Sequence, residues 1–94
     1  MKRIILALAM VLPMSAAAQE QHHCVGAGDL AEVAMKARQA GMPMSSALDG
    51  QGNDVVRKII MGAYDKPRFM TQTHKRQAVQ NYRIEWERRC YRAE

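Results

Sequence analysis

Apolar side chains recur at helical spacing along most of the chain, and most clearly near its C-terminal end. No Gly or Pro occurs between Thr73 and Glu94, and the apolar positions there follow one another at steps of three or four residues. The positions that share one helix face are Val79, Tyr82, Trp86 and Cys90. We expect a helix that is capped by Thr71 or Thr73 and runs to about Arg92.

A first helix is predicted between Asp29 and Ala40. Asp29 and Glu32 have the spacing of a capping box, with Asp29 as the N-cap. Gly41 is expected to end the helix, and Pro43 prevents it from resuming. The residues expected to form its buried stripe are Leu30, Val33, Ala34 and Ala37.

A central helix is predicted from Val55 to about Tyr64, the most apolar part of the chain after residue 18. Its β-branched residues are also compatible with a strand, but the spacing of three to four residues favours a helix. Asn53 or Asp54 can cap its start, and Pro67 prevents its continuation. Its inner face is expected to hold Val56, Ile59, Ile60 and Ala63.

The connections between these helices are short. Ser45 or Ser46 is expected to cap a short helical segment before a loop formed by residues 49–53, which contains two glycines. Phe69 and Met70 are expected to pack under the turn that precedes the last helix. The predicted fold is all-α, a small bundle of three long helices plus one short helix.

Residues 1–18 have the pattern of a secretory signal peptide. Two basic residues are followed by an apolar run of nine, and three alanines precede Gln19 at the expected cleavage site. A transmembrane anchor is the alternative, but nine apolar residues are too few to cross a bilayer, which requires about 20. We therefore expect a bacterial protein exported to the periplasm or secreted, with one helical domain over residues 19–94.

The two cysteines of the chain, Cys24 and Cys90, lie near opposite ends of that domain. In an exported chain of this size they are expected to form one intramolecular disulfide. A metal thiolate, a bridge between two chains and two free thiols are the alternatives. Leu, Ile, Val and Phe together number only eleven after residue 18, and so lean a core is expected to need a covalent link.

Charge is modest overall and unevenly distributed. After residue 18, twelve basic side chains stand against nine acidic ones, which gives a net charge of +3. This excess is too small to indicate a nucleic-acid partner. Residues 19–56 carry −3 and residues 57–94 carry +6, so the two halves should attract each other in an antiparallel helical fold.

The basic residues near the C-terminus are the best candidates for contact with a partner. They are Lys75, Arg76, Arg83, Arg88, Arg89 and Arg92. A solvated helix face is the alternative, but arginine pairs well with carboxylates and phosphates and is enriched in interfaces. Ile84 and Tyr91 lie on the face away from Trp86 and would form the apolar centre of such an interface. The predicted partner-binding residues are Arg83, Ile84, Arg88, Tyr91 and Arg92.

Metal binding and catalysis have less support. The possible metal ligands are His22, His23, Cys24 and His74. Two of these histidines are adjacent and the cysteine is expected to be oxidised, so we predict no metal site. Met42 and Met44 have the pairing of Cu(I)-binding thioethers, although packing is the favoured interpretation. No hydrolase motif is present, and Glu85 and Glu87 project from different sides of a helix. We therefore expect neither enzymatic activity nor a cofactor.

Several features give the chain a family resemblance. They are an early Cys24, an Ala-Arg-Gln-Ala-Gly helix end at residues 37–41, a Gly-Ala-Tyr helix end at residues 62–64, and a late Cys90. In this layout the chain resembles small exported helical proteins of proteobacteria and their phages or prophages. These in turn resemble periplasmic acid-stress chaperones, from which the chain departs because it is basic and has its cysteines at the extreme ends.

The expected function is that of a non-enzymatic binding or interaction protein. Its partner would be a periplasmic or envelope protein. The phage-like resemblance implies modulation of the host envelope, such as superinfection exclusion or inhibition of a periplasmic protein. The alternative is a helical stress-response or chaperone-like protein whose basic helix lies on an anionic membrane surface.

Overall fold

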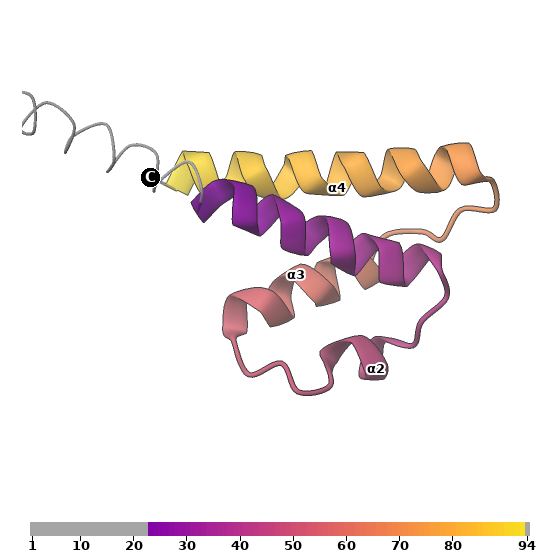
Figure 1. Ribbon diagram of the computed structural model, residues 1–94, viewed down its shortest axis with the longest axis horizontal. Helices are drawn as coiled ribbons and strands as arrows, with labels where there is room; N and C mark the ends of the chain where they lie inside the picture. Colours follow the sequence, from indigo (N-terminus) through magenta and orange to yellow (C-terminus); the bar gives the residue numbers. More distant parts are fainter. Residues whose placement is uncertain (1–22, 94) are drawn as a thin grey trace, which may run out of the picture.

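The computed structural model describes residues 23–93, which fold into helices and contain no strand. The first helix covers residues 23–39, and it is followed by α2 (Met44–Leu48), α3 (Asp54–Tyr64) and α4 (Gln72–Ala93), as Figure 1 shows. The all-α prediction is confirmed for this range, but the helices are unequal: α4 has 22 residues and α3 has 11. The predicted signal peptide, residues 1–18, lies outside the described residues.

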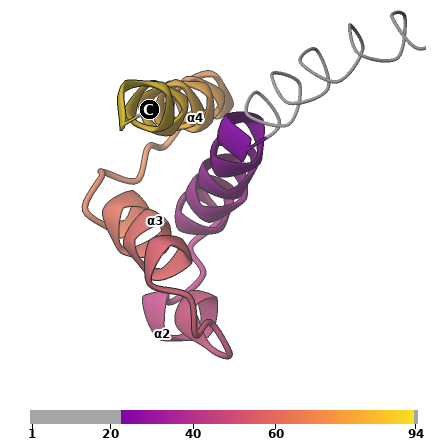
Figure 2. The same cartoon turned by 90° about the vertical axis from the view of Figure 1, so that its left-hand side faces the viewer.

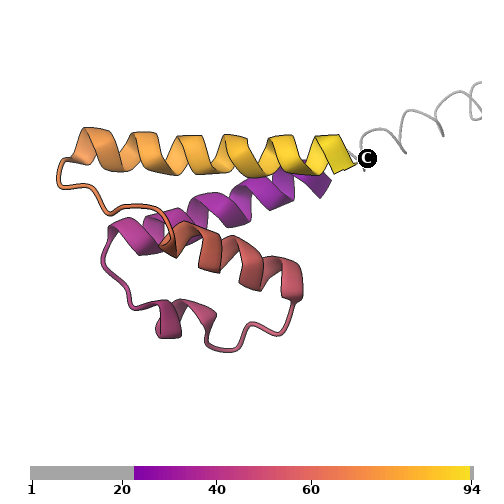
Figure 3. The same cartoon turned by 180° about the vertical axis from the view of Figure 1, so that it is seen from behind.

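The first helix and α4 lie side by side and run in opposite directions (Figures 1 and 3). In the end-on view of Figure 2, these two helices and α3 surround a shared interior, and α2 lies beyond α3. The buried core residues are Ala31, Ala34, Met35, Ile59, Ile60, Ala63, Val79 and Tyr82. Three of these eight side chains are alanines, so the interior is as lean as the composition indicates.

A disulfide joins the first helix to the end of α4, as predicted. Cys24 and Cys90 are bonded, their Cα atoms lie 5.4 Å apart, and Cys24 is completely buried. Such a bond is typical of proteins that fold in an oxidising compartment. No helix within residues 23–93 combines the length and the apolar character needed to span a bilayer.

The first helix extends further toward the N-terminus than its capping pattern indicates. The prediction that Asp29 is the N-cap is wrong, because Asp29 lies inside the helix and its side chain is exposed. Gly28 is buried at a close approach to α4, where an added Cβ would lie 2.6 Å from the Glu87 carboxylate. Glycine disfavours helix by itself, and here the bond at Cys24 and this tight packing hold the segment in place.

The buried stripe of the first helix is also displaced from the predicted one. Leu30 and Val33 are exposed, Val33 to 65%, and Ala37 is only partly buried. Of the four predicted residues only Ala34 is buried, and the other buried positions of this helix are Cys24, Gly28, Ala31, Met35 and Gln39. The disulfide explains the difference, because it turns the face of Cys24, and with it positions four, seven and eleven residues later, toward the core.

The ends of the helices largely follow the sequence. Gly41 ends the first helix in the left-handed conformation, with a φ of 86°. The Asn53 side chain caps α3 by accepting hydrogen bonds from two N–H groups of its first turn. Thr71 caps α4 through a 3.2 Å hydrogen bond that its hydroxyl accepts from the backbone N–H of His74. These three predictions are confirmed.

Two expectations about the connections are wrong. α2 begins after Pro43 without a side-chain cap, and Ser45 and Ser46 lie within it. The carbonyl of Pro43 accepts hydrogen bonds from two N–H groups of the turn and closes it without a serine. Met70 is 92% exposed rather than packed, whereas the neighbouring Phe69 is partly buried. The chain bends at Met70, just before α4, so this side chain turns into solvent while that of Phe69 faces the bundle.

Candidate binding surface on the C-terminal helix

The inner face of α4 anchors the helix to the rest of the fold. Val79 and Tyr82 are buried, and Trp86 packs against the core. The Tyr82 hydroxyl donates a 2.5 Å hydrogen bond to the backbone carbonyl of Ile59 in α3. Burial raises the pKa of Tyr82 above its ordinary value, while a contact with Trp86 acts in the opposite direction. The predicted inner face is therefore confirmed, and it leaves the opposite face of α4 free of the bundle.

One side of α4 is attached to the first helix by a cluster of charges around Arg83. Its Nη1 lies 2.6 Å from Asp29 Oδ1 and 2.7 Å from Glu32 Oε2, and its Nε lies 2.9 Å from Glu87 Oε1. The hydrogen bond to Asp29, followed by that to Glu32, raises the pKa of Arg83 against the opposing effect of desolvation. In this cluster, carboxylates of the acidic first half of the domain pair with an arginine of the basic second half, as predicted.

The other side of α4 is attached to the turn after α3. Glu85 pairs with Lys66 at 3.3 Å and, more distantly, with Arg89 at 3.9 Å. The Arg89 guanidinium also lies over the Trp86 ring, 4.9 Å from the ring centroid. Glu85 and Glu87 therefore serve opposite sides of the helix, as their spacing predicts, and they do not form a joint acidic site.

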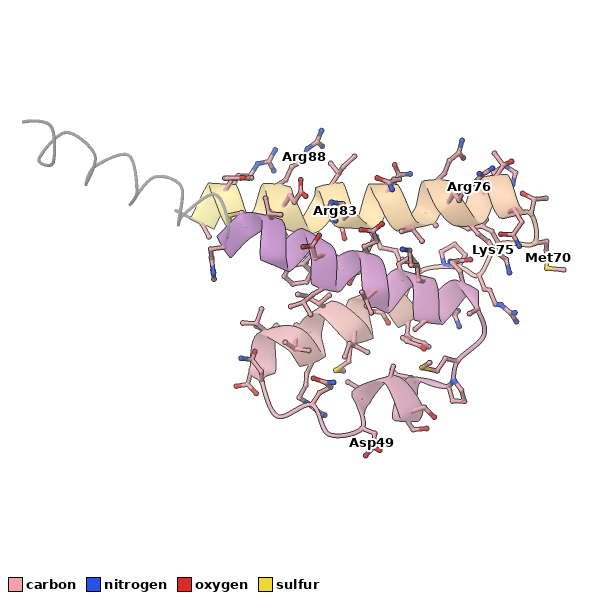
Figure 4. The ribbon with its side chains drawn as sticks, viewed as in Figure 1. Asp49, Met70, Lys75, Arg76, Arg83 and Arg88 are labelled. Atoms are coloured by element: carbon pink, nitrogen blue, oxygen red, sulfur yellow. A yellow bond between two sulfur atoms is a disulfide. The ribbon has the colours of Figure 1, made fainter. Side chains whose placement is uncertain are left out.

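The outer face of α4 carries most of the predicted partner-binding residues. Ile84 and Tyr91 are 44% and 48% exposed, and Arg88 and Arg92 are exposed beside them. Within residues 23–93 neither arginine has an ion pair or a hydrogen bond. Figure 4 shows Arg88 pointing away from the bundle, whereas Arg83 lies between α4 and the first helix. The structure thus keeps four of the five residues together and assigns Arg83 to the internal cluster.

Lys75 and Arg76 lie at the opposite end of α4, far from this group. They line a hollow of about 540 Å³ between the first helix and the start of α4. The Lys75 ammonium donates a 3.0 Å hydrogen bond to the backbone carbonyl of Gln39, so it helps to join the two helices. Arg76 projects outward in Figure 4. The basic residues of α4 therefore do not form one continuous patch.

The candidate metal ligands are not brought together. Cys24 is bonded to Cys90, and His74, sixteen residues before Cys90 in one helix, lies about 24 Å along its axis. The His74 Nδ1 is 2.9 Å from the Thr71 hydroxyl. No group of three or more potential ligands that could hold an ion occurs within residues 23–93. His22 lies outside that range.

The methionines are more exposed than a packing role requires. Met35 is buried, but Met42 and Met44 are both partly open to solvent on either side of Pro43. The packing interpretation therefore does not hold for this pair, because a gap-filling side chain would be enclosed.

A buried glutamine that the sequence pattern does not single out holds the loop before α4. Gln39 Nε2 donates to the carbonyl of Pro67 at 2.9 Å, and its Oε1 accepts from the N–H of Phe69 at 2.8 Å. Its own backbone carbonyl accepts from Arg68 and Lys75. Only its position, one turn after Met35 in the helix, indicates burial, and this signal is weak for a glutamine.

Comparison of the chain with protein-family models, with curated proteins and with solved structures found no match in any of the three. The functional argument therefore depends on the residues and the geometry of this chain.

Proposed function

We propose that the protein is a non-enzymatic binding protein of the bacterial envelope. It acts through the outer face of α4, defined by Ile84, Arg88, Tyr91 and Arg92, on an acidic surface of a protein partner. The observation that carries this proposal is the pairing of two exposed apolar side chains with two arginines that have no counter-charge in the described chain. Arginine and tyrosine are the residues most enriched at the centres of interfaces.

The rigidity of α4 supports this role. The helix is fixed by the disulfide at Cys90, by the cluster around Arg83 and by the Tyr82 hydroxyl, so its outer face is presented without further ordering. A preformed surface loses little conformational entropy on binding. The phage-like layout of the sequence is consistent with a partner in the host envelope, where the protein would modulate or inhibit an envelope component.

A protein partner is favoured over a membrane surface by the composition of this face. One and two turns before Ile84, the same side of α4 presents Gln77, Gln80 and Asn81, all exposed and polar. A helix that lies on a membrane needs an apolar face along most of its length. The apolar part of the outer face is a short patch, which suits a localised protein contact.

A site-specific crosslinking experiment tests the proposal. A photoreactive benzoyl-phenylalanine is placed at Ile84 or, as a control of similar exposure, at Met61 on α3, and the protein is irradiated in the bacterial periplasm. We expect an adduct of one defined mass from position 84 only. Adducts from neither position, or equally from both, would contradict the assigned surface.

Charge reversal sharpens this test. Arg88→Glu should abolish the adduct, because it places a carboxylate against an acidic partner. Lys58→Glu reverses a charge at an exposed position of α3 and should leave the adduct unchanged.

Co-sedimentation with anionic liposomes distinguishes a protein partner from the membrane alternative. Binding at low salt that disappears at high salt would favour that alternative over a protein partner.

A further inference from the structure

An apolar groove lies between the first helix, α3 and the last turns of α4. Its larger part has a volume of about 720 Å³, within the usual range for small-molecule sites. A second hollow of about 290 Å³ continues between the first helix, α2 and α3. Leu30, Val56 and Ile59 line both hollows, so the two hollows adjoin at these residues.

The walls of this groove expose large apolar side chains that the fold itself does not use. Leu30 and Val55 are 42% and 56% exposed, and Val33 and Met42 line the smaller hollow with much of their surface open. The chain has few large apolar residues, and burying these four in the core would have made the fold more stable. Exposed apolar surface grouped in a concavity is typical of a binding site.

The charged side chains around the groove differ in sign between its two ends. Arg89 and His23 line the larger hollow, and among residues 23–93 no Asp or Glu lines it. Within residues 23–93, Arg89 pairs with Glu85 at 3.9 Å, and Glu85 lies closer, at 3.3 Å, to Lys66. At the far end, Asp49 lines the smaller hollow, on the loop after α2 (Figure 4). An anionic group would therefore be attracted to the Arg89 end and repelled from the other.

The walls of the larger hollow offer little to a polar ligand. Among residues 23–93, Asn53 is the one side-chain amide that lines the larger hollow, and its Oδ1 already accepts two hydrogen bonds from the start of α3. A sugar or a nucleotide would leave its hydroxyl and amide groups unpaired in such a groove, at a free-energy cost.

We propose that this groove binds a long-chain fatty acid. The carboxylate lies against the Arg89 guanidinium, and the single acyl chain extends along Leu30, Val56 and Ile59 toward α2. A planar guanidinium and a carboxylate form two parallel charge-assisted hydrogen bonds, and the apolar lining of the larger hollow accommodates an unbranched chain. The site is independent of the outer face of α4, because Ile84, Arg88 and Tyr91 do not line the groove.

Trp86 provides the measurement, since it is the single tryptophan of the chain and lines the groove. The disulfide-bonded protein is titrated with sodium dodecanoate below its micelle concentration, with 1-dodecanol and with sodium butyrate. Trp86 fluorescence and calorimetry follow binding. We expect saturable one-to-one binding of dodecanoate, weaker binding of dodecanol, which lacks the charge, and none of butyrate, which lacks the chain.

Substitutions test which residues contact the carboxylate and which contact the acyl chain. Arg89→Gln should weaken dodecanoate binding about tenfold, as loss of a charge-assisted contact predicts, and leave dodecanol binding within about twofold. Arg88→Gln, one residue away on the outer face, is the matched control and should change neither. Leu30→Gln and Val55→Gln, at exposed positions on different helices, should weaken both ligands, with folding checked by circular dichroism.

Several results would overturn the proposal. These are no binding of dodecanoate to the wild-type protein, equal losses from Arg88→Gln and Arg89→Gln, and tighter binding of a lauroyl lysophospholipid than of dodecanoate. A dimer that forms without ligand and shields Trp86 would also overturn it, because the groove would then be the contact with a second copy of the chain.

Discussion

The Tyr82 hydroxyl lies directly against Gly62, so that α4 approaches α3 where α3 has no side chain. A Cβ added at Gly62 would lie 2.5 Å from the Tyr82 oxygen. The same hydroxyl donates its hydrogen bond to the Ile59 carbonyl, one turn earlier in α3. A glycine inside a helix is ordinarily unfavourable, and here it provides the space in which the two helices are joined.

Substitution of Gly62 by alanine should therefore destabilise the protein. In an exposed helix this change stabilises by up to about 1 kcal/mol, but here the new methyl group displaces Tyr82 and breaks its hydrogen bond. Overpacking of this kind costs about 1–3 kcal/mol, so we expect the free energy of unfolding to fall by about 1–2 kcal/mol. Urea denaturation followed by circular dichroism measures the change.

A double-mutant cycle tests the cause. In the Tyr82→Phe background the hydroxyl is absent, so Gly62→Ala should become neutral or stabilising. Gly26→Ala is a control in the first helix, where nothing lies within 4 Å of the new Cβ, and it should stabilise. If Gly62→Ala costs as much in the Tyr82→Phe background as in the wild-type protein, the hydroxyl is not the reason for the glycine.

Removal of the Gln39 amide should release the loop before α4. Gln39→Met keeps a similar volume but leaves the Phe69 N–H and the Pro67 carbonyl without their partner. Both hydrogen bonds are partly buried, so each unpaired group costs toward the lower end of about 1–3 kcal/mol, and we expect the free energy of unfolding to fall by roughly 2 kcal/mol in total. Hydrogen exchange at the Phe69 amide should accelerate in the same variant.

The control for this prediction is Gln77→Met, an equivalent change at an exposed position of α4. It should alter stability by less than about 0.5 kcal/mol. Unchanged exchange at Phe69 in Gln39→Met would show that the loop is held by other contacts, such as those of Arg68 and Lys75 with the Gln39 backbone.

The helices and the disulfide could be predicted from the sequence because they depend on local signals. Steps of three and four residues identify α3 and α4, and Gly41, Asn53 and Thr71 end or begin helices through contacts within a few residues. The pairing of Cys24 with Cys90 needed only a count of two cysteines and an expected export signal. These features do not depend on how the helices pack.

The orientation of the first helix could not be predicted in the same way. Leu30 and Val33 have the best apolar spacing in that helix, yet smaller residues such as Ala31 are buried instead. The choice of face follows from the disulfide and from the close approach of α4 at Gly28, and both are tertiary contacts. The groove is a direct result, because the displaced apolar residues form its wall.

The candidate surface on α4 could be predicted only in part, because some of its residues depend on contacts with another helix. Ile84 and Tyr91 lie opposite the buried face, and their exposure follows from helical periodicity alone. Arg83 is one residue from Ile84, and its involvement with Asp29 and Glu32 depends on the position of another helix. The sequence alone does not show whether a basic side chain pairs with an acidic residue of the same molecule or with one of a partner.

Stability should decrease at alkaline pH through Tyr82. Because its pKa is raised above the ordinary value of 10.0 by burial, the unfolded chain loses the phenolic proton at a lower pH than the folded chain does. Above about pH 10 the unfolded state therefore binds fewer protons, and the free energy of unfolding falls as the pH rises. The contribution is fully present at pH values well below the ordinary pKa.

Comparison with Tyr82→Phe isolates this effect. At pH 7 the variant should be less stable by about 1 kcal/mol, since it lacks the hydrogen bond to Ile59. The difference in free energy of unfolding between Tyr82→Phe and wild type, measured by urea denaturation at each pH, should become smaller as the pH rises above about 10. Tyr91→Phe, which removes a partly exposed hydroxyl, is the control. A difference for Tyr82→Phe that stays constant from neutral to strongly alkaline pH would contradict the prediction.

Loss of the disulfide should bring the fold close to its limit of stability. Cys24 and Cys90 are 66 residues apart, and closing a loop of that length stabilises by roughly 4 kcal/mol on the chain-entropy model. Small domains have a total stability of about 5–15 kcal/mol, so the Cys24→Ala, Cys90→Ala variant should unfold at a much lower urea concentration. Wild-type protein reduced with a phosphine should behave the same way, because the bond rather than the cysteine side chains is responsible. If both forms keep the unfolding midpoint of the oxidised protein, the helices are held by their packing alone, and the link between Cys24 and Cys90 is not what stabilises so lean a core.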